Sequence, residues 1–247
     1  MALRETYEKQ GAFLFRWRSY IPLLLIPIVF IALRDPSYSA PSFEGSLGRC
    51  WDAFAILVSL SGLIVRAMVA GYVPRGTSGR NTLTQVAESL NTKGMYSIVR
   101  NPLYLGNFLM IFGIFLFLQV WWFVILGSLL FWVYYERIIF TEEEFLRKKF
   151  GEPYVAWSNK TPVFIPNFKT WQKSDLPFSW KTVLRREHSS FFGMVAVFTV
   201  LGLISDLFIE RCGISLFWLI FFGGGLLIYS VLRFLKKKTH LLDMEGR

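Results

Sequence analysis

The first residues that could do chemistry lie in a polar segment at 94–106, which reads GMYSIVRNPLYLG. Its Arg100 carries a fixed positive charge. Asn101 precedes Pro102, which biases the asparagine away from helical geometry and suits the first turn of a helix. The first N–H groups of such a helix have no partner within it, so they favour negative charge or ligand acceptor atoms. An ordinary capped helix start is the alternative interpretation.

A second polar segment begins at Thr141 and reads TEEEFLRKKFGEPYVAW, with adjacent carboxylates at Glu142 and Glu143. Thr141 and Glu144 form a T-x-x-E capping box, so we expect a short amphipathic helix that starts there and stops at Gly151. The two carboxylates then either complement the dipole of a solvated helix start or face the first polar segment. In the second case they accept hydrogen bonds from ligand hydroxyls or offset a cationic ligand.

Three more charged residues lie within or at the end of apolar segments, namely Arg66, Glu136 and Arg137. A charge inside an apolar span is costly and normally faces an interior partner or a water-filled pocket. A fixed arginine binds phosphate or carboxylate without quenching an attacking oxygen. We therefore take these three as candidate catalytic residues, with Arg75, Arg80 and Arg100 as further phosphate ligands. The alternative for Arg66 is snorkelling or a pair with a nearby acid such as Glu136.

The composition excludes several classes of protein. Hydrophobic residues make up 53% of the 247 residues and charged residues 18%, which is unlike a soluble domain. The 25 Phe, 10 Tyr and 9 Trp exclude intrinsic disorder. Two cysteines and two histidines are too few for a zinc cluster or an iron–sulfur site. We read the net charge of +10 as membrane topology and not as a nucleic-acid surface.

Apolar stretches between charged residues predict an all-α, polytopic membrane helical bundle with about six transmembrane helices and a cytoplasm-facing pocket. The uncharged run at 101–135 is too long for one span, so we expect it to turn at Gln119, beside two tryptophans. A signal peptide is the alternative for the first stretch. The expected spans are 19–33, 51–73, 103–118, 121–140, 191–209 and 213–232.

Lysine and arginine set the expected orientation. They concentrate in four segments that fall on one side of the membrane if six helices cross. These segments are 4–18, 75–100, 147–186 and 233–238, while the opposite loops hold Arg34, Arg49 and Arg211. The positive-inside rule therefore places both termini in the cytoplasm, with a bacterial inner membrane as the expected location.

The same topology places Cys50 and Cys212 on the outer side. They are either two unpaired thiols or a disulfide formed in an oxidising periplasm. A mobility difference on non-reducing gels decides between the two.

The two polar segments, with the apolar hairpin between them, resemble the isoprenylcysteine carboxyl methyltransferase and phospholipid methyltransferase superfamily. The resemblance covers residues 51–168. Its first motif is Gly94-x-Tyr96-x-x-x-Arg100-Asn101-Pro102-x-Tyr104-x-Gly106, and its second is Glu142-Glu143-x-x-Leu146-x-x-x-Phe150-Gly151-x-x-Tyr154. The resemblance implies S-adenosylmethionine bound between the cytoplasmic ends of membrane helices, in keeping with the absence of a G-x-G-x-x-G fingerprint.

The resemblance also implies a set of cofactor-binding residues, with the two polar segments forming two walls of the pocket. They are Tyr96, Arg100, Asn101, Pro102, Tyr104, Gly106, Glu142 and Glu143. Asn101 occupies a position where many relatives have histidine, and Trp157 one where tyrosine is frequent. A finer similarity is to bacterial members proposed to methylate the phosphate of lipid A.

The expected organisation is an N-terminal segment with the first span (1–50), a methyltransferase core (51–168) and a C-terminal linker with a transmembrane hairpin (169–247). The expected function is S-adenosylmethionine-dependent methylation of the headgroup of a membrane lipid or lipidated substrate, with phosphate or carboxylate favoured and no role for nucleic acid or metal. The alternatives are an NADPH-dependent membrane lipid or sterol reductase and a non-enzymatic membrane protein.

Overall fold

The computed structural model describes residues 3–18, 20–39, 45–74, 87–209 and 213–244. In these ranges the regular structure is helical. The α-helices are α1 (Leu3–Arg16), α2 (Ile26–Leu33), α3 (Pro36–Ser39), α4 (Gly45–Tyr72), α5 (Met95–Ile98), α6 (Pro102–Phe117), α7 (Trp121–Phe150), α8 (Glu152–Ser158), α9 (Trp180–Ile204) and α10 (Leu216–Lys238). Shorter helical turns are Ile21–Leu25, Phe168–Thr170 and the π-helical turn Ser205–Ile209.

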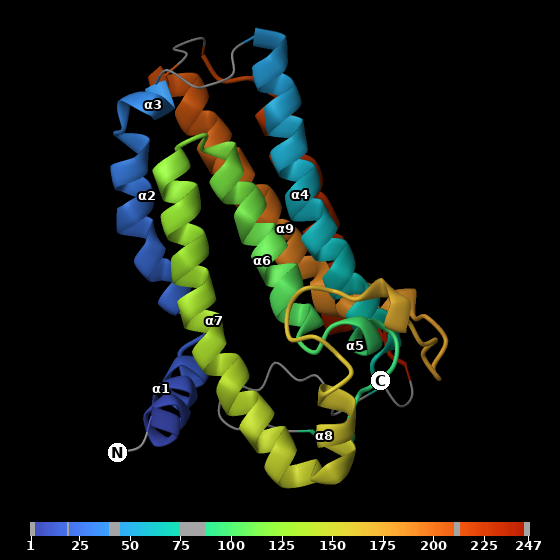
Figure 1. Ribbon diagram of the computed structural model, residues 1–247. Helices are drawn as coiled ribbons and strands as arrows, with labels where there is room; N and C mark the ends of the chain where they lie inside the picture. The colour runs from blue at the N-terminus through green and yellow to red at the C-terminus, as the bar shows by residue number, and fades with distance from the viewer. Residues whose placement is uncertain (1–2, 19, 40–44, 75–86, 210–212, 245–247) are drawn as a thin grey trace.

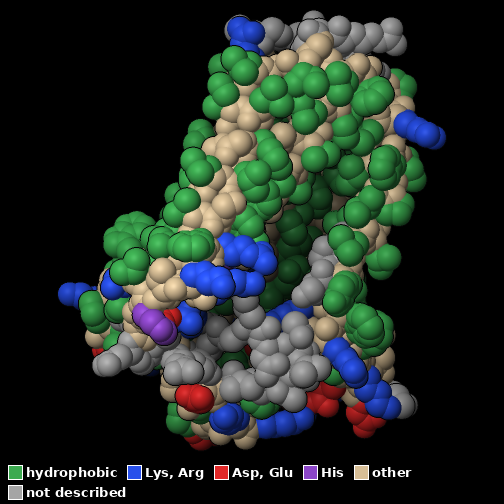
Figure 2. Space-filling model, turned by 180° about the vertical axis from the view of Figure 1, so that it is seen from behind, with side chains coloured by type: hydrophobic (Ala, Val, Ile, Leu, Met, Phe, Trp, Pro, Cys, Tyr) green, Lys and Arg blue, Asp and Glu red, His purple; other side chains and the backbone are tan. Residues whose placement is uncertain are grey.

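The long helices run side by side along one axis, and α1, α5 and α8 lie at the lower end of the bundle in Figure 1. Helix α4 packs most extensively against α6 and also contacts α9, which in turn packs against α10. Helix α7 contacts α6 and, at its lower end, α1. The view from behind shows hydrophobic side chains over the upper part of the molecule and most charged side chains at the lower end (Figure 2).

These features confirm the predicted all-α membrane bundle. Four helices are long and apolar enough to cross a membrane: Leu47–Tyr72, Trp121–Phe150, Trp180–Phe208 and Leu216–Lys238. The first and third predicted spans correspond to shorter apolar helices, Leu23–Leu33 and Pro102–Phe117. Helix α1 and the end of α10 lie at the same end of the bundle, as six crossings require (Figure 1). Which side of the membrane this end faces stays a prediction.

The predicted turn in the long uncharged run is confirmed. Helix α6 ends at Phe117 and α7 begins at Trp121, with Gln119 at φ +55° between them. This backbone conformation is uncommon for a residue with a Cβ atom and reverses the chain within a few residues. Trp121 and Trp122 are exposed beside the turn, as side chains of an interfacial aromatic belt would be.

The prediction of a separate helix that begins at Thr141 is wrong. Helix α7 is continuous for 30 residues, and the Thr141 hydroxyl donates to the Arg137 carbonyl at 3.1 Å, inside the helix. A helix of this length measures about 45 Å, so part of α7 projects beyond a bilayer core of about 30 Å. The predicted stop is confirmed, because Gly151 has φ +59°, which a glycine adopts without strain.

Helix α1 packs against this projecting part of α7. A Cβ atom on Gly11 would lie 1.9 Å from the Thr141 hydroxyl oxygen, so only glycine permits the approach. Several polar contacts accompany it. They are the ion pair of Arg4 with Glu144, the pair of Glu8 with Lys148 at 2.8 Å, and Arg137 over the Tyr7 ring at 3.6 Å. The N-terminal segment therefore supports the end of α7.

Close packing of α4 and α6 depends on glycines. A Cβ atom on Gly113 would lie 2.4 Å from both the Ala55 carbonyl oxygen and the Ser59 hydroxyl oxygen. The Ser59 hydroxyl also donates to the Met110 carbonyl across the interface. Small residues let membrane helices approach closely, and packing of this kind is their main source of association.

Some expectations fall on residues that the structure does not describe. Arg75 and Arg80 lie outside the described residues, as does Cys212. Cys50 is exposed, and because Cys212 lies outside the described residues, the choice between free thiols and a disulfide stays open.

We predict that Gly113→Ala lowers the free energy of unfolding by about 1–3 kcal/mol, because the added methyl group overpacks the α4–α6 contact. Gly223→Ala on α10 is the matched control, since a Cβ atom there meets nothing within 4 Å. The measurement is unfolding by sodium dodecyl sulfate titration in mixed micelles. Equal stability of the two variants would contradict the packing described here.

Candidate functional site

The two polar segments meet at the lower end of the bundle. Arg100, which follows α5, donates from Nη1 to Oε2 of Glu143 on α7 at 2.9 Å. Their side chains are 17% and 25% exposed. The carboxylates of α7 therefore face the segment that precedes α6, as one of the two interpretations of the sequence required.

A third segment holds the first polar segment in place. Residues 162–172 run antiparallel to 94–101, and the backbone N–H of Arg100 donates to the Pro162 carbonyl at 2.8 Å. Further contacts are Asn167 N–H to Ile98 carbonyl at 2.9 Å, Gly94 N–H to Gln172 carbonyl at 2.9 Å and Thr170 hydroxyl to Ser97 carbonyl at 2.7 Å. The Asn101 amide donates to the Val163 carbonyl at 3.2 Å. Asn101 thus ties these two segments together.

The Arg100–Glu143 pair has polar atoms without partners. Arg100 Nε, Glu143 Oε1 and the Tyr154 hydroxyl are buried, and none has a hydrogen bond within the described structure. Tyr154, on α8, is 1% exposed and lies beside both charged groups, although its hydroxyl does not reach hydrogen-bond geometry with either. Burial, and next the negative charge of Glu143, raise the pKa of Tyr154. Each unsatisfied buried group costs about 1–3 kcal/mol, so the cluster is arranged as a ligand site would be.

Glu142 lies beside a second group of side chains. Its carboxylate lies beside the Tyr104 hydroxyl at the start of α6. Arg18 Nη1, beyond the end of α1, is 4.0 Å from Oε1 of Glu142. The Tyr104 ring packs against Tyr135 of α7 with centroids 4.7 Å apart. Glu142 and Glu143 therefore contact different partners: Arg18 lies beside Glu142, and Arg100 pairs with Glu143.

Tyr96 lines a cavity of about 330 Å³ between the end of α4 and the loops around it. Other lining residues are Tyr72, Leu90, Asn91, Lys93 and Asp175. Lys93 and Asp175 form an ion pair at 2.7 Å. Burial, and next the negative charge of Glu142, raise the pKa of Tyr96. Of the predicted cofactor-binding residues, Tyr96 is the one that lines this cavity.

Packing explains the positions of two other predicted residues. Pro102 is buried at the first turn of α6. A Cβ atom on Gly106 would lie 2.6 Å from Cγ of Arg66 and 2.8 Å from the Gly62 carbonyl oxygen. Gly106 therefore makes room for the arginine side chain and for α4, and cofactor contacts at both residues stay predictions.

Arg66, on α4, lies in a polar network between helices. Its Nε and Nη2 donate to the carboxylate of Glu187 on α9 at 2.8 and 3.0 Å, and its Nη1 donates to Asn107 on α6. The Asn107 amide donates to the Tyr135 hydroxyl at 3.3 Å. Arg66 therefore pairs with an acid, as the alternative interpretation held, but the acid is Glu187 and not Glu136.

Glu136 and Arg137 pair with each other at 3.3 Å, and the Glu136 side chain is 49% exposed. The structure therefore groups these two with α1, through the Arg137–Tyr7 contact, whereas Arg66 belongs to the network that includes Glu187. Sequence reasoning did not select Glu187. An acidic residue inside the N-terminal half of an apolar helix is a signal that could have identified it as a partner for Arg66.

Comparison with known proteins agrees with the motifs. Residues 53–153 match the family model described as phospholipid methyltransferase. Over 77 residues the chain is 36% identical to protein-S-isoprenylcysteine O-methyltransferase of Schizosaccharomyces pombe (strain 972 / ATCC 24843). This match covers 31% of the chain and about a third (33%) of the relative's length. No solved structure matches significantly. The two matches confirm the resemblance to the isoprenylcysteine and phospholipid methyltransferase superfamily.

We predict that Tyr154→Phe raises the stability of the ligand-free protein by about 1 kcal/mol, because it removes a buried hydroxyl that has no partner. The control is Tyr20→Phe, which removes an exposed hydroxyl and should leave stability unchanged. The measurement is the midpoint of thermal unfolding in detergent. A loss of stability in Tyr154→Phe would show that the hydroxyl has a partner in the ligand-free protein.

Proposed function

We propose that this chain, with its match to the phospholipid methyltransferase family at residues 53–153, is an integral membrane methyltransferase that uses S-adenosylmethionine. Its substrate is the headgroup of a lipid or a lipidated molecule. The observation that carries the proposal is the buried cluster of Arg100, Glu143 and Tyr154. The cluster joins the two motifs of the resemblance and presents three polar atoms without partners.

These residues fit the chemistry of S-adenosylmethionine, the methyl donor. The Arg100 Nε–H suits the donor's carboxylate, because an arginine and a carboxylate form a charge-assisted hydrogen bond. Glu143 Oε1 suits the ammonium group or a ribose hydroxyl, and the Tyr154 hydroxyl can donate or accept. Tyr96 and Glu142 would form adjoining parts of the pocket, on the cavity side and on the Tyr104 side respectively.

When bound, S-adenosylmethionine supplies a methyl group on a positively charged sulfur, which leaves as a neutral thioether when an acceptor oxygen displaces it in line. The residues of this chain must exclude water and align the reacting groups at about 3 Å, and such positioning can contribute about 7–11 kcal/mol. An anionic acceptor needs no general base. Arg66 is the residue that we assign to the acceptor, because its fixed charge binds an oxyanion without protonating it.

An anionic headgroup is the acceptor that the charge distribution favours. The net charge of the chain is +10. Lysine and arginine side chains gather at the charged end of the molecule, below the apolar surface (Figure 2). Basic side chains at the surface of a membrane attract anionic lipids. We propose a phosphate or a carboxylate as the methylated group, with the phosphate of lipid A as one specific candidate. The name of the yeast relative adds an isoprenylated cysteine as another.

The test is transfer of label from S-adenosyl-[methyl-¹⁴C]methionine by the purified protein in lipid nanodiscs. Three acceptors separate the chemistries: N-acetyl-S-farnesylcysteine for carboxylate, lipid A for phosphate and phosphatidylethanolamine for amine. We expect label on one of the two anionic acceptors. An absence of label on all three, together with spectral changes on addition of NADPH, would support a reductase instead.

We predict that Glu143→Gln weakens S-adenosylmethionine binding by at least about tenfold, which corresponds to about 1.4 kcal/mol, and that Glu143→Ala abolishes it. The glutamine keeps the size of the side chain but removes the charge that pairs with Arg100. Isothermal titration calorimetry on folded protein measures the affinity. Glu152→Ala, which removes an exposed carboxylate nearby on α8, is the control. Wild-type affinity in Glu143→Ala would refute this binding assignment.

A further inference from the structure

We infer that Glu187 is a positioning residue for Arg66, and that α9 is thereby part of the catalytic unit. This inference rests on the proposed function, in which Arg66 binds the acceptor. Glu187 lies beyond the family match, which covers residues 53–153. Helix α9 nevertheless supplies the counter-ion of the charged residue inside α4.

The contact between the two residues is bidentate. Nε and Nη2 of Arg66 donate to the two carboxylate oxygens of Glu187 at 2.8 and 3.0 Å. The side chains are 15% and 9% exposed. Two parallel hydrogen bonds fix the plane of the guanidinium as well as its position. The stem of Arg66 is also confined, because it passes over Gly106 at a distance that a Cβ atom would block.

A guanidinium has five N–H groups, and their partners leave one for a ligand. Glu187 accepts from Nε and Nη2, Ser190 accepts from Nη2 at 3.4 Å, and Asn107 accepts from Nη1. Within the described structure the remaining N–H is the second one on Nη1. Because Glu187 fixes the plane of the guanidinium, it also fixes the direction of this donor. We assign the donor to an oxygen of the anionic acceptor.

Glu187 also tunes the charge that the acceptor meets. An unpaired arginine in an apolar region would be costly and would bind any available anion. Paired with Glu187, the guanidinium keeps its positive charge while the carboxylate partly offsets it, so Arg66 orients an oxyanion without holding it tightly enough to quench its attack. A pair that served only to hold α4 against α9 would not affect the acceptor selectively, so the two roles predict different results.

The test compares Glu187→Gln and Glu187→Asp with wild type in two assays on the nanodisc-reconstituted protein. Calorimetry gives the affinity for S-adenosylmethionine. Single-turnover transfer of labelled methyl to lipid A and to N-acetyl-S-farnesylcysteine gives kcat/KM for the acceptor. We expect Glu187→Gln to lower acceptor kcat/KM by about 10²-fold, the size of effect that a misplacement of about 1 Å produces, with donor affinity unchanged. Glu187→Asp keeps the charge and should restore part of the loss.

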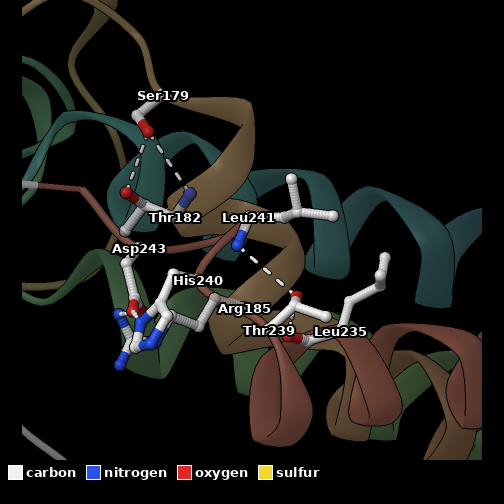
Figure 3. A network of polar contacts seen from close by, with 8 residues as sticks. All are labelled: Ser179, Thr182, Arg185, Leu235, Thr239, His240, Leu241 and Asp243. Carbon is white, nitrogen blue, oxygen red and sulfur yellow. Dashed lines mark hydrogen bonds and ion pairs between the residues drawn. The ribbon is translucent and has the colours of Figure 1, made fainter.

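The matched control is Asp243→Asn. It removes the acid that pairs with Arg185, an arginine of α9, the helix that also carries Glu187. Arg185 of α9 pairs with Asp243 at 2.7 Å, and His240 contacts the same carboxylate at 2.8 Å (Figure 3). The pKa of Asp243 is lowered first by the hydrogen bond with His240 and then by the charge of Arg185, so Asp243 carries a charge at neutral pH. This pair is exposed, so the control should retain wild-type values in both assays.

A measurement of stability, made without substrate, tests the Arg66–Glu187 ion pair itself. The thermal unfolding midpoints of Arg66→Gln, Glu187→Gln and the double variant form a cycle. We expect the double variant to be more stable than either single variant, because each single variant leaves one buried charge uncompensated. Additive losses of stability would overturn the inferred pairing.

The outcomes separate this inference from the proposed function. Wild-type acceptor kcat/KM in folded Glu187→Gln overturns the inference alone, as does a parallel loss of donor affinity. If Glu187→Gln does not fold, Glu187→Asp decides in the same way, with a selective loss of acceptor kcat/KM supporting the inference and wild-type values overturning it. If the wild-type protein neither binds donor nor transfers label, the proposed function fails and the inference fails with it.

Discussion

The ion pair between Arg100 and Glu143 is the contact on which the candidate site depends. A charged side chain at the boundary of a bilayer must be hydrated or paired with an opposite charge. A side chain that is partly buried loses hydration, so it depends more on the paired charge. The two residues are 43 positions apart, and an apolar hairpin separates them in the chain. Their pairing therefore requires the α6–α7 hairpin to bring both motifs to the same end of the bundle. The position of the site follows from this constraint.

The length of α7 determines how the second motif reaches the first. The helix continues beyond the thickness of a bilayer core, so its last turns form a rigid arm that carries Glu142 and Glu143. Gly151 then reverses the chain into α8, which places Tyr154 beside the ion pair. Helix α1 packs along the arm and covers part of it. Elements from three parts of the chain thus hold one cluster of side chains.

Local signals predicted much of this fold. Apolar runs between charges indicated the membrane helices, Pro102 indicated the start of α6, and Gly151 indicated the end of α7. The prediction of a helix start at Thr141 was wrong because the side chains of a capping box are also accepted inside a helix. With no glycine or proline between that residue and Gly151, continuation of α7 carried no penalty.

Pairings between distant residues could not be predicted in the same way. Arg66 and Glu187 are 121 positions apart, and periodicity within one helix does not indicate which of several acids an arginine will meet. The packing of α1 on α7 is another such contact, since Gly11 is informative only once its neighbour is known. The burial of the Tyr154 hydroxyl belongs to the same class. Such contacts depend on the three-dimensional arrangement of helices whose individual sequences are compatible with several arrangements.

The most direct measurement of the central claim is an electron cryomicroscopy structure of the protein in nanodiscs with S-adenosylhomocysteine, the demethylated form of the donor. The account predicts ligand density in contact with Arg100 Nε, Glu143 Oε1 and the Tyr154 hydroxyl, so that each of the three atoms gains a partner. Ligand density elsewhere in the molecule, with these three atoms still unpartnered, would contradict it.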